Sequence, residues 1–365
     1  MAAVNATAVA VKVDAPVVVA QAQPVVAAAV PVQGAKVVTG GNVNQAVDLT
    51  AFANLANWNS FTLKQRAWEM EAMTCGLKAN GYEVCGVDPN VNGGQPVPIF
   101  RVKEESDCCT RWCCGPRHPF LLHVFNSRAT GNIIHPPKCC GMGAPDYPEV
   151  VTDGAPVMTL ERDGLCNKCP NCWVCHECCQ DEMHVHAGNI HGVPGALDKS
   201  TAFGRNIVPM GGGGCTPTVN IMDRTDPSEE KVAAVVQGPT FFGGCLDLAT
   251  DTSFGISRNG DGSADVGVMT KEKPEGCEGM CRAIFSDADS YKLDLTDKNL
   301  TPQQKAQLIA NILHLDYMFF EQDNNFIRVE KQGDSWVLYI NCCSCYCYGC
   351  ICPCELCIPL NSNNN

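Results

Sequence analysis

The chain has 365 residues, of which 45% are hydrophobic and 18% charged, so we expect a globular protein with one or two cores rather than a disordered one. Its formal net charge of −13 argues against nucleic-acid binding and against unaided docking on an anionic membrane leaflet, because both require clustered lysine and arginine. We therefore expect no nucleic-acid partner.

Cysteine is the unusual residue of this composition, with 26 copies, many of them adjacent or two apart. The N-terminus does not resemble a secretory signal, since Lys12 is the only basic residue before Lys36 and prolines interrupt the apolar run. We therefore expect an intracellular protein with mostly reduced thiols, in which clustered cysteines indicate metal binding or acylation. A secreted, cystine-rich protein is the alternative.

Residues 1–58 repeat alanine, valine, proline and glutamine, with few aromatic or charged side chains. Such a segment cannot specify a core, and we interpret it as a disordered arm that can dock protein partners. A β-rich domain is predicted over residues 59–325, followed by a cysteine-rich tail over residues 326–365.

Short runs that alternate in polarity, or that are rich in β-branched residues, recur through the predicted domain between clusters of glycine, proline and asparagine. They are Tyr82–Val87, Val97–Val102, Phe120–Phe125, Val157–Leu160, Met183–His186, Val219–Met222, Val232–Val236 and Tyr291–Leu295. This pattern favours a closed or sandwiched antiparallel sheet over strand–helix–strand units.

One long helix is predicted over residues 302–322. Thr301 can cap it, Pro302 suits its first position, and Gln304 can complete a capping box. Polar side chains recur at steps of three and four residues and form a narrow stripe on an otherwise apolar helix. The stripe consists of Gln304, Gln307, Asn311, His314 and Glu321.

The composition of this helix favours a position in the protein core over one in a membrane. A transmembrane helix needs about 20 apolar residues, and an aspartate at the bilayer centre costs about 2.5–3.5 kcal/mol. Asp316 interrupts the apolar surface, and Ala306–Leu315, the stretch without a charged residue, is only half a span. We therefore expect a core helix.

Six motifs occur in a fixed order along the chain. They are Asp107–Pro116, Thr159–Arg162, the cysteine ladder Cys166–Cys179, Gln237–Pro239, Phe285–Asp289 and Asp316–Glu321. In this order they resemble the phospholipid scramblase family, and the resemblance covers about Phe61 to Glu321. It implies a tubby-like, mainly β, α+β fold, in which a closed antiparallel β-barrel of about twelve strands surrounds a central hydrophobic C-terminal helix.

The cysteine ladder offers thiols about every three residues. These are Cys166, Cys169, Cys172, Cys175, Cys178 and Cys179. The resemblance assigns them to S-palmitoylation, which suits an acidic protein, because several acyl chains hold a protein firmly on a bilayer whereas one does so only marginally. A thiolate Zn²⁺ site and unmodified loop thiols stay open, since two Cys-x-x-Cys pairs supply tetrahedral ligands.

The tail adds eight further thiols between Cys342 and Cys357, where most members of the family end after a short polar stretch. Only Glu355 is charged within this stretch. A second acylated patch, a metal-bound knob and a surface for self-association are all compatible with this composition.

Asp287, Asp289 and Asp294 form a candidate Ca²⁺ site, because calcium prefers several carboxylate and carbonyl oxygens on a short flexible turn. The resemblance places the family's proposed calcium segment at Asp287–Lys298. The EF-hand pattern fails here, since the sixth position is not glycine and the twelfth is lysine. Residues 291–295 also alternate as a half-buried strand does, so an acidic turn that leads into a barrel strand is the alternative.

The resemblance implies calcium-stimulated, ATP-independent, bidirectional movement of phospholipids between membrane leaflets, without covalent catalysis. It also implies a peripheral or acyl-anchored protein at the cytoplasmic face of the plasma membrane. Lipid headgroups would need a polar path, for which Gln307, Asn311 and His314 are the candidates. The alternative is a non-transporting scaffold that binds lipid headgroups or proteins, and a zinc-dependent nucleic-acid module fits the cysteines but not the charge.

Overall fold

The computed structural model of the chain describes fourteen stretches of sequence. They are residues 53–65, 80–114, 118–127, 156–163, 180–188, 190, 200, 202–206, 214–224, 231–276, 289–320, 327–333, 335–347 and 350–360. Most of the predicted arm and the whole cysteine ladder lie outside these residues. The predicted domain boundaries at residues 58 and 325 therefore stay predictions.

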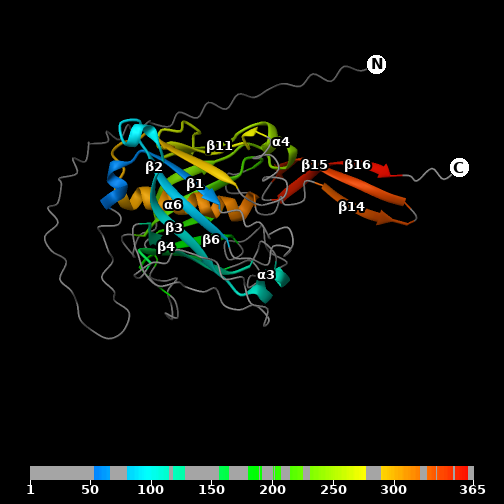
Figure 1. Cartoon of the computed structure of the whole chain (residues 1–365), viewed down its shortest axis with the longest axis horizontal. Coiled ribbons are helices and arrows are strands. Elements are labelled where there is room, and N and C mark those ends of the chain that lie inside the picture. The colour runs from blue at the N-terminus through cyan, green and yellow to red at the C-terminus, as the bar shows by residue number, and fades with distance from the viewer. Residues whose placement is uncertain are drawn as a thin grey trace, which may run out of the picture. The chain divides into compact units, whose positions relative to one another are not determined.

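Twelve of the described strands form a closed antiparallel barrel (Figure 1). They are β1 (Ser60–Gln65), β2 (Gly81–Val87), β3 (Val97–Glu105), β4 (Phe120–Asn126), β5 (Met158–Arg162), β6 (Glu182–Ala187), β7 (Ala202–Asn206), β8 (Thr218–Asp223), β9 (Lys231–Gln237), β11 (Thr252–Ser257), β12 (Gly267–Lys271) and β13 (Ser290–Leu295). Apart from the closing pair β1–β13, each strand pairs with the barrel strands before and after it in the chain. The predicted fold class is confirmed.

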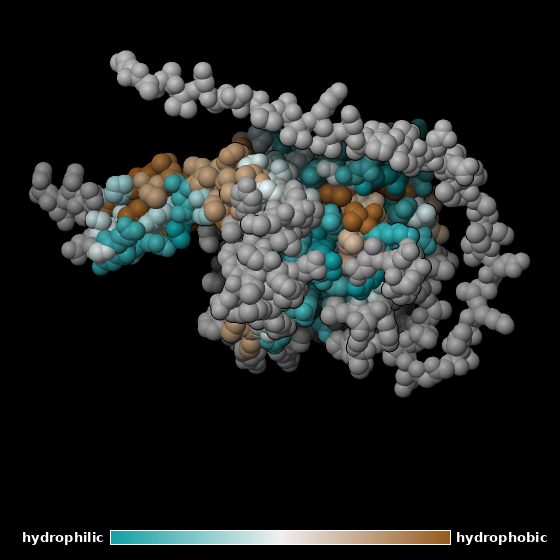
Figure 2. All heavy atoms as spheres, turned by 180° about the vertical axis from the view of Figure 1, so that it is seen from behind, coloured by the Kyte–Doolittle hydropathy of each residue, from teal (hydrophilic) through white to brown (hydrophobic). Residues whose placement is uncertain are grey.

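A second sheet contains β14 (Ile327–Gln332), β15 (Ser335–Cys347) and β16 (Cys350–Leu360), so the cysteine-rich tail is folded along most of its length. The short strand β10 (Phe241–Phe242) pairs with β15 and joins this sheet to the rest of the chain. Figure 2 shows brown, apolar residues beside teal, hydrophilic ones along the sheet. The remaining short elements are η1 (Asn54–Asn57), η2 (Asn92–Gly94), α3 (Cys108–Cys114) and α4 (Gly244–Ala249).

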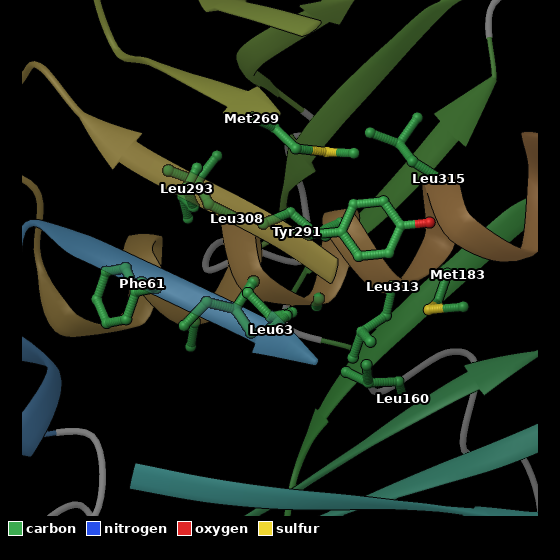
Figure 3. Packing of buried hydrophobic residues seen from close by; sticks show 14 of the residues in the cluster. Phe61, Leu63, Leu160, Met183, Met269, Tyr291, Leu293, Leu308, Leu313 and Leu315 are labelled. Carbon is green, nitrogen blue, oxygen red and sulfur yellow. The ribbon is translucent and has the colours of Figure 1, made fainter. Parts of the chain in front are cut away.

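Alternation of side chains along the strands builds the barrel core. Every second residue of β1 and of β13 is buried, including Phe61 and Leu63 of β1 and Tyr291 and Leu293 of β13. The residues between them lie on the outer side and are partly or fully exposed. Figure 3 shows these inward side chains packed around the helix that carries Leu308. The alternation predicted for residues 291–295 is therefore present in the structure.

The helix inside the barrel is α6 (Pro302–Leu315), which continues as the π-helical turn η8 (Asp316–Phe320). The predicted capping box forms, with a 3.2 Å bond from the Gln304 amide to Thr301 Oγ1 and a 2.9 Å bond from the Thr301 amide to Gln304 Oε1. Every residue from Lys305 to Phe320 except Gln307 is buried, as predicted for a core helix. No helix in the described part of the chain is long and apolar enough to cross a membrane.

A buried lysine ties the first turn of α6 to η1. The Nζ of Lys305 lies within hydrogen-bonding distance of four acceptors, the carbonyl oxygens of Leu55 (3.2 Å), Ala56 (3.3 Å) and Trp58 (2.6 Å), and Asn59 Oδ1 (3.2 Å). The last carbonyl groups of a helical turn lack partners within the turn, and a lysine can satisfy them. Burial lowers the pKa of Lys305 below its ordinary value.

The aspartate that interrupts the apolar surface of the helix has partners in the barrel wall. Asp316 accepts a 2.6 Å hydrogen bond from the hydroxyl of Tyr82 in β2 and a second, shorter one from the hydroxyl of Tyr291 in β13. Burial raises the pKa of Asp316 to about 6, and the nearby charge of Asp289 acts in the same direction. The helix is thus fixed to two strands that lie on either side of β1.

Replacing Lys305 by methionine should lower the free energy of unfolding by about 1–3 kcal/mol, because the carbonyl groups of Leu55 and Trp58 lose their shared donor. Urea unfolding followed by circular dichroism measures this change. Lys292→Met is the matched control, since Lys292 is half-exposed on the outer face of β13 and pairs with exposed Asp294. It should change stability by less than about 0.5 kcal/mol, and equal losses in the two variants would contradict the role of Lys305.

Replacing Asp316 by asparagine should change how stability depends on pH. Because the pKa of Asp316 is raised to about 6 in the folded state, its contribution is fully present below the unfolded-state pKa and is lost as the pH rises through 6. Asp316→Asn cannot ionise, so the fall in melting temperature between about pH 4 and pH 6.5 should become shallower. Asp294→Asn, at an exposed position, should keep the wild-type slope. An unchanged slope in Asp316→Asn would refute this assignment.

Candidate functional site

The polar stripe of α6 faces the wall formed by β6, β7 and β8. Gln307, Asn311 and His314 line a cavity there with Ala310 of the same helix. The wall contributes Met183, Val185, Ala202, Phe203, Gly204 and Ile221. The cavity leaves about 10 Å³ for the centre of a water molecule, which is room for about one water. The three candidate path residues thus lie together, in a space far smaller than a lipid headgroup.

Asn311 and His314 are the residues of this stripe whose buried polar side-chain atoms have no hydrogen-bond partner in the described structure. The side chain of Asn311 is 4% exposed, and neither its amide nitrogen nor its amide oxygen has such a partner. Gly204 permits this arrangement, since a Cβ at that position would lie 2.5 Å from Asn311 Nδ2 and 3.0 Å from His314 Nδ1. A buried amide without partners costs about 1–3 kcal/mol, so this packing is not optimised for stability alone.

His314 links the stripe to a buried ion pair between Arg162, at the end of β5, and Asp181. Arg162 donates to Asp181 through Nε (2.9 Å) and Nη2 (2.5 Å), and His314 Nε2 lies 3.7 Å from Asp181 Oδ1. Burial opposes ionisation of Asp181, but the charge and hydrogen bonds of Arg162 and the nearby His314 together outweigh it and hold the pKa of Asp181 below its usual range. Burial lowers the pKa of His314, so this imidazole is neutral at pH 7.

The described carboxylates of the candidate calcium site point in different directions. Asp289 Oδ2 lies 2.8 Å from Lys271 Nζ, whereas Asp294 is on the outer face of β13 and accepts a 2.7 Å hydrogen bond from Ser60. Positions 289 and 294 are five residues apart along an extended chain and therefore face opposite sides. Asp287 lies outside the described residues, and the calcium site stays a prediction.

A network around Lys271 was missed by the sequence analysis. Lys271 pairs with Asp289 (2.8 Å) and Asp247 (3.1 Å), and its Nζ lies 4.1 Å from the ring centroid of Phe320. Burial alone would lower the pKa of Lys271, but the charges of Asp289 and Asp247 raise it above its ordinary value. The sequence could have indicated this network, because Lys271 is two residues after buried Met269 in β12 and therefore lies on the same, inward face of the strand.

A second missed cluster lies around Glu104, at the inward side of β3. Its carboxylate accepts hydrogen bonds from the Tyr317 hydroxyl (2.8 Å) and the Asn80 amide (2.8 Å), and it lies 2.9 Å from His118 Nε2. Burial opposes ionisation of Glu104, but the hydrogen bond and charge of His118, together with the bonds from Ser106 and Asn80, outweigh it, so the pKa of Glu104 is lowered. This cluster fixes η8 to the wall.

The cysteine ladder Cys166–Cys179 lies outside the described residues, so acylation, zinc binding and unmodified thiols remain open there. In the part of the chain that the structure describes, no group of three or more His, Cys, Asp or Glu side chains is arranged to hold a metal ion. The described thiols of the tail lie in the hairpin β15–β16.

Comparisons with known proteins identify relatives of this chain. The family model described as Scramblase matches residues 149–322. Phospholipid scramblase 1 of Mus musculus is 25% identical over 282 residues, which are 77% of this chain and 66% of the relative. Phospholipid scramblase 1 of Homo sapiens is 26% identical over 279 residues (76% and 68%), and phospholipid scramblase 2 of Bos taurus is 24% identical over 223 residues (61% and 57%).

The chain therefore spans between about half and two thirds of the length of the curated relatives it matches. The match to the family model includes β5 to β13, α6 and η8, which together form most of the barrel and its central helix. The same region holds the polar stripe and the predicted acidic turn. Residues 149–322 are thus similar to the Scramblase family, and the chain resembles phospholipid scramblases 1 and 2.

Proposed function

We propose that this protein moves phospholipids between the two leaflets of a membrane, in both directions and without ATP. The observation that carries the proposal is the family match over the barrel and its central helix, whose relatives are named phospholipid scramblases. Movement of a lipid makes and breaks no covalent bond, so no catalytic residue is required. The proposed place of action is the cytoplasmic face of the plasma membrane, with acyl chains on Cys166–Cys179 as anchors.

The polar stripe supports the proposal because a headgroup that crosses an apolar region needs hydrogen-bonding partners. Asn311 has a donor and an acceptor without partners, and neutral His314 lies beside it. The cavity is too small for a headgroup, so transport would require α6 to separate from β6, β7 and β8. This separation breaks no hydrogen bond of Asn311, and water or a headgroup would then supply the partners that its amide lacks.

Calcium stimulation is proposed to act at the sequence segment that contains Asp287 and precedes β13, which the sequence predicts to be an acidic turn. Asp294 is half-exposed on the outer face, and Asp289 is held by Lys271. A cation that took the Asp289 carboxylate would leave Lys271 with Asp247 as its remaining carboxylate partner, next to the ring of Phe320 in η8. The proposed coupling therefore runs from the turn to the central helix through Lys271.

The transport step can be tested with purified protein in liposomes that carry a fluorescent phospholipid. Under the proposal, calcium should accelerate the loss of leaflet asymmetry, measured as the fraction of the fluorescent lipid that dithionite quenches. Protein that binds the vesicles and leaves the asymmetry intact would overturn the proposal. That result would favour the second candidate, a non-transporting scaffold that binds lipid headgroups or proteins.

The path can be tested separately with Asn311→Leu. Leucine has a similar volume and removes the unpartnered amide, so the free energy of unfolding should rise by about 1 kcal/mol or more. Scrambling should slow by about tenfold, the equivalent of about 1.4 kcal/mol of lost headgroup interaction. Gln303→Leu, at an exposed position of α6, is the control and should change neither quantity. A stabilised Asn311→Leu protein with the wild-type rate would exclude the stripe as the path.

A further inference from the structure

The sheet β14–β15–β16 sorts its side chains onto two faces by polarity. Directly paired residues of antiparallel strands lie on the same face, and neighbours along a strand alternate between faces. Between β14 and β15, Ile327 pairs with Ile340 and Val329 with Leu338. Between β15 and β16, Trp336 pairs with Leu360, Leu338 with Ile358 and Ile340 with Leu356. We call these eight side chains the apolar face.

The apolar face is open to solvent. Ile327 is 58% exposed, Trp336 51% and Leu356 52%, and the patch continues without interruption across all three strands. Exposed apolar residues scattered singly need no explanation, but a contiguous apolar patch marks a surface that is covered in use.

Cysteines extend the apolar face along the hairpin. A bulge between Asn341 and Cys343 shifts the register, so that Cys343 pairs with Cys354 and Cys345 with Cys352. On β16, residues 352 and 354 have the same parity as 356, 358 and 360, so these four thiols share the apolar face. Burial and then its neighbour Cys354 raise the pKa of Cys343 to about 11. Uncharged thiols behave as small apolar groups.

The charges of the same three strands lie almost entirely on the opposite face. Arg328, Glu330 and Glu355 share that face, and Arg328 Nη2 lies 3.3 Å from Glu355 Oε2. Among the described residues of the apolar face, the charged side chain is Lys331, beside Trp336. The chain as a whole has 39 acidic residues and a net charge of −13. None of the described residues of this face carries a carboxylate, so an anionic bilayer does not repel them.

We propose that the apolar face is the surface by which this protein docks on a phospholipid bilayer, with its strands in the headgroup layer and its apolar side chains inserted below. The pair Lys331 and Trp336 at one end suits that layer, where tryptophan and lysine are enriched beside anionic lipids. A sheet with one apolar and one charged face is the β-strand counterpart of an amphipathic interfacial helix. The face lies outside the residues that match the family model, and the docking proposal rests on the proposed function for its lipid partner.

The test adds two negative charges to either face of the full-length protein. Val329→Glu with Leu356→Glu places them on the apolar face, and Gln332→Glu with Pro359→Glu places them on the opposite face, so the net charge changes equally. Binding is measured by co-sedimentation with vesicles of phosphatidylcholine and of phosphatidylcholine with phosphatidylserine at 4:1. Circular dichroism and the melting temperature establish that each variant is folded.

The wild type should bind both kinds of vesicle, the apolar-face variant at least about tenfold more weakly, and the opposite-face variant within about twofold of the wild type. Brominated lipids should quench a component of the tryptophan fluorescence that is absent in Trp336→Phe. Wild-type protein that does not bind, or equal weakening by both variants, would overturn the proposal. So would a wild-type dimer that the apolar-face variant dissociates while vesicle binding stays intact, because the face would then bind a second copy.

These measurements report docking alone. Protein that docks through the apolar face but moves no lipid would refute the proposed function and leave the docking surface standing. Protein that scrambles lipids equally well with charges on either face would refute the docking surface and leave the proposed function standing.

Discussion

The interior of a closed sheet of twelve strands is too wide for the strands' own side chains to fill, and in this protein a helix fills it. A helix that is apolar on nearly all sides is stable only where apolar groups surround it, and the inward residues of the barrel supply that surrounding. The rest of the structure depends on this fit. Every polar group that α6 or η8 brings into the barrel needs a partner there or lowers stability.

The partners are unevenly distributed along the helix. At its start Lys305 is bound by the carbonyl groups of η1, and at its end Asp316 and Tyr317 are bound by tyrosine and glutamate side chains of the wall. Between them, Asn311 faces β7 with no partner for its amide. The helix therefore has hydrogen-bonded polar partners at both ends, whereas separation from β7 would break no hydrogen bond of Asn311.

Local patterns in the sequence predict the elements of this fold but not the contacts between distant ones. A core helix that follows a barrel strand could be predicted from patterns among neighbouring residues. These patterns are the capping box at Thr301, the alternation of residues 291–295 and the position of Asp316 in the apolar helix. One partner of Asp316 is Tyr82, 234 residues earlier in the chain, and no local pattern identifies it. The same holds for Lys271 with Asp247, and for the bulge after Asn341 that decides which face carries the thiols.

The two sheets meet at the end of the central helix, and this joins the proposed docking surface to the proposed path. Tyr346, on the inner side of β15, is buried against Phe319 of η8, with ring centroids 6.0 Å apart. Phe320, the next residue, lies under the ammonium group of Lys271. A force applied to β15 at a bilayer surface would thus reach η8 through packed aromatic rings, and η8 continues directly into the helix that carries Asn311. Docking and separation from the wall would then act on one continuous element.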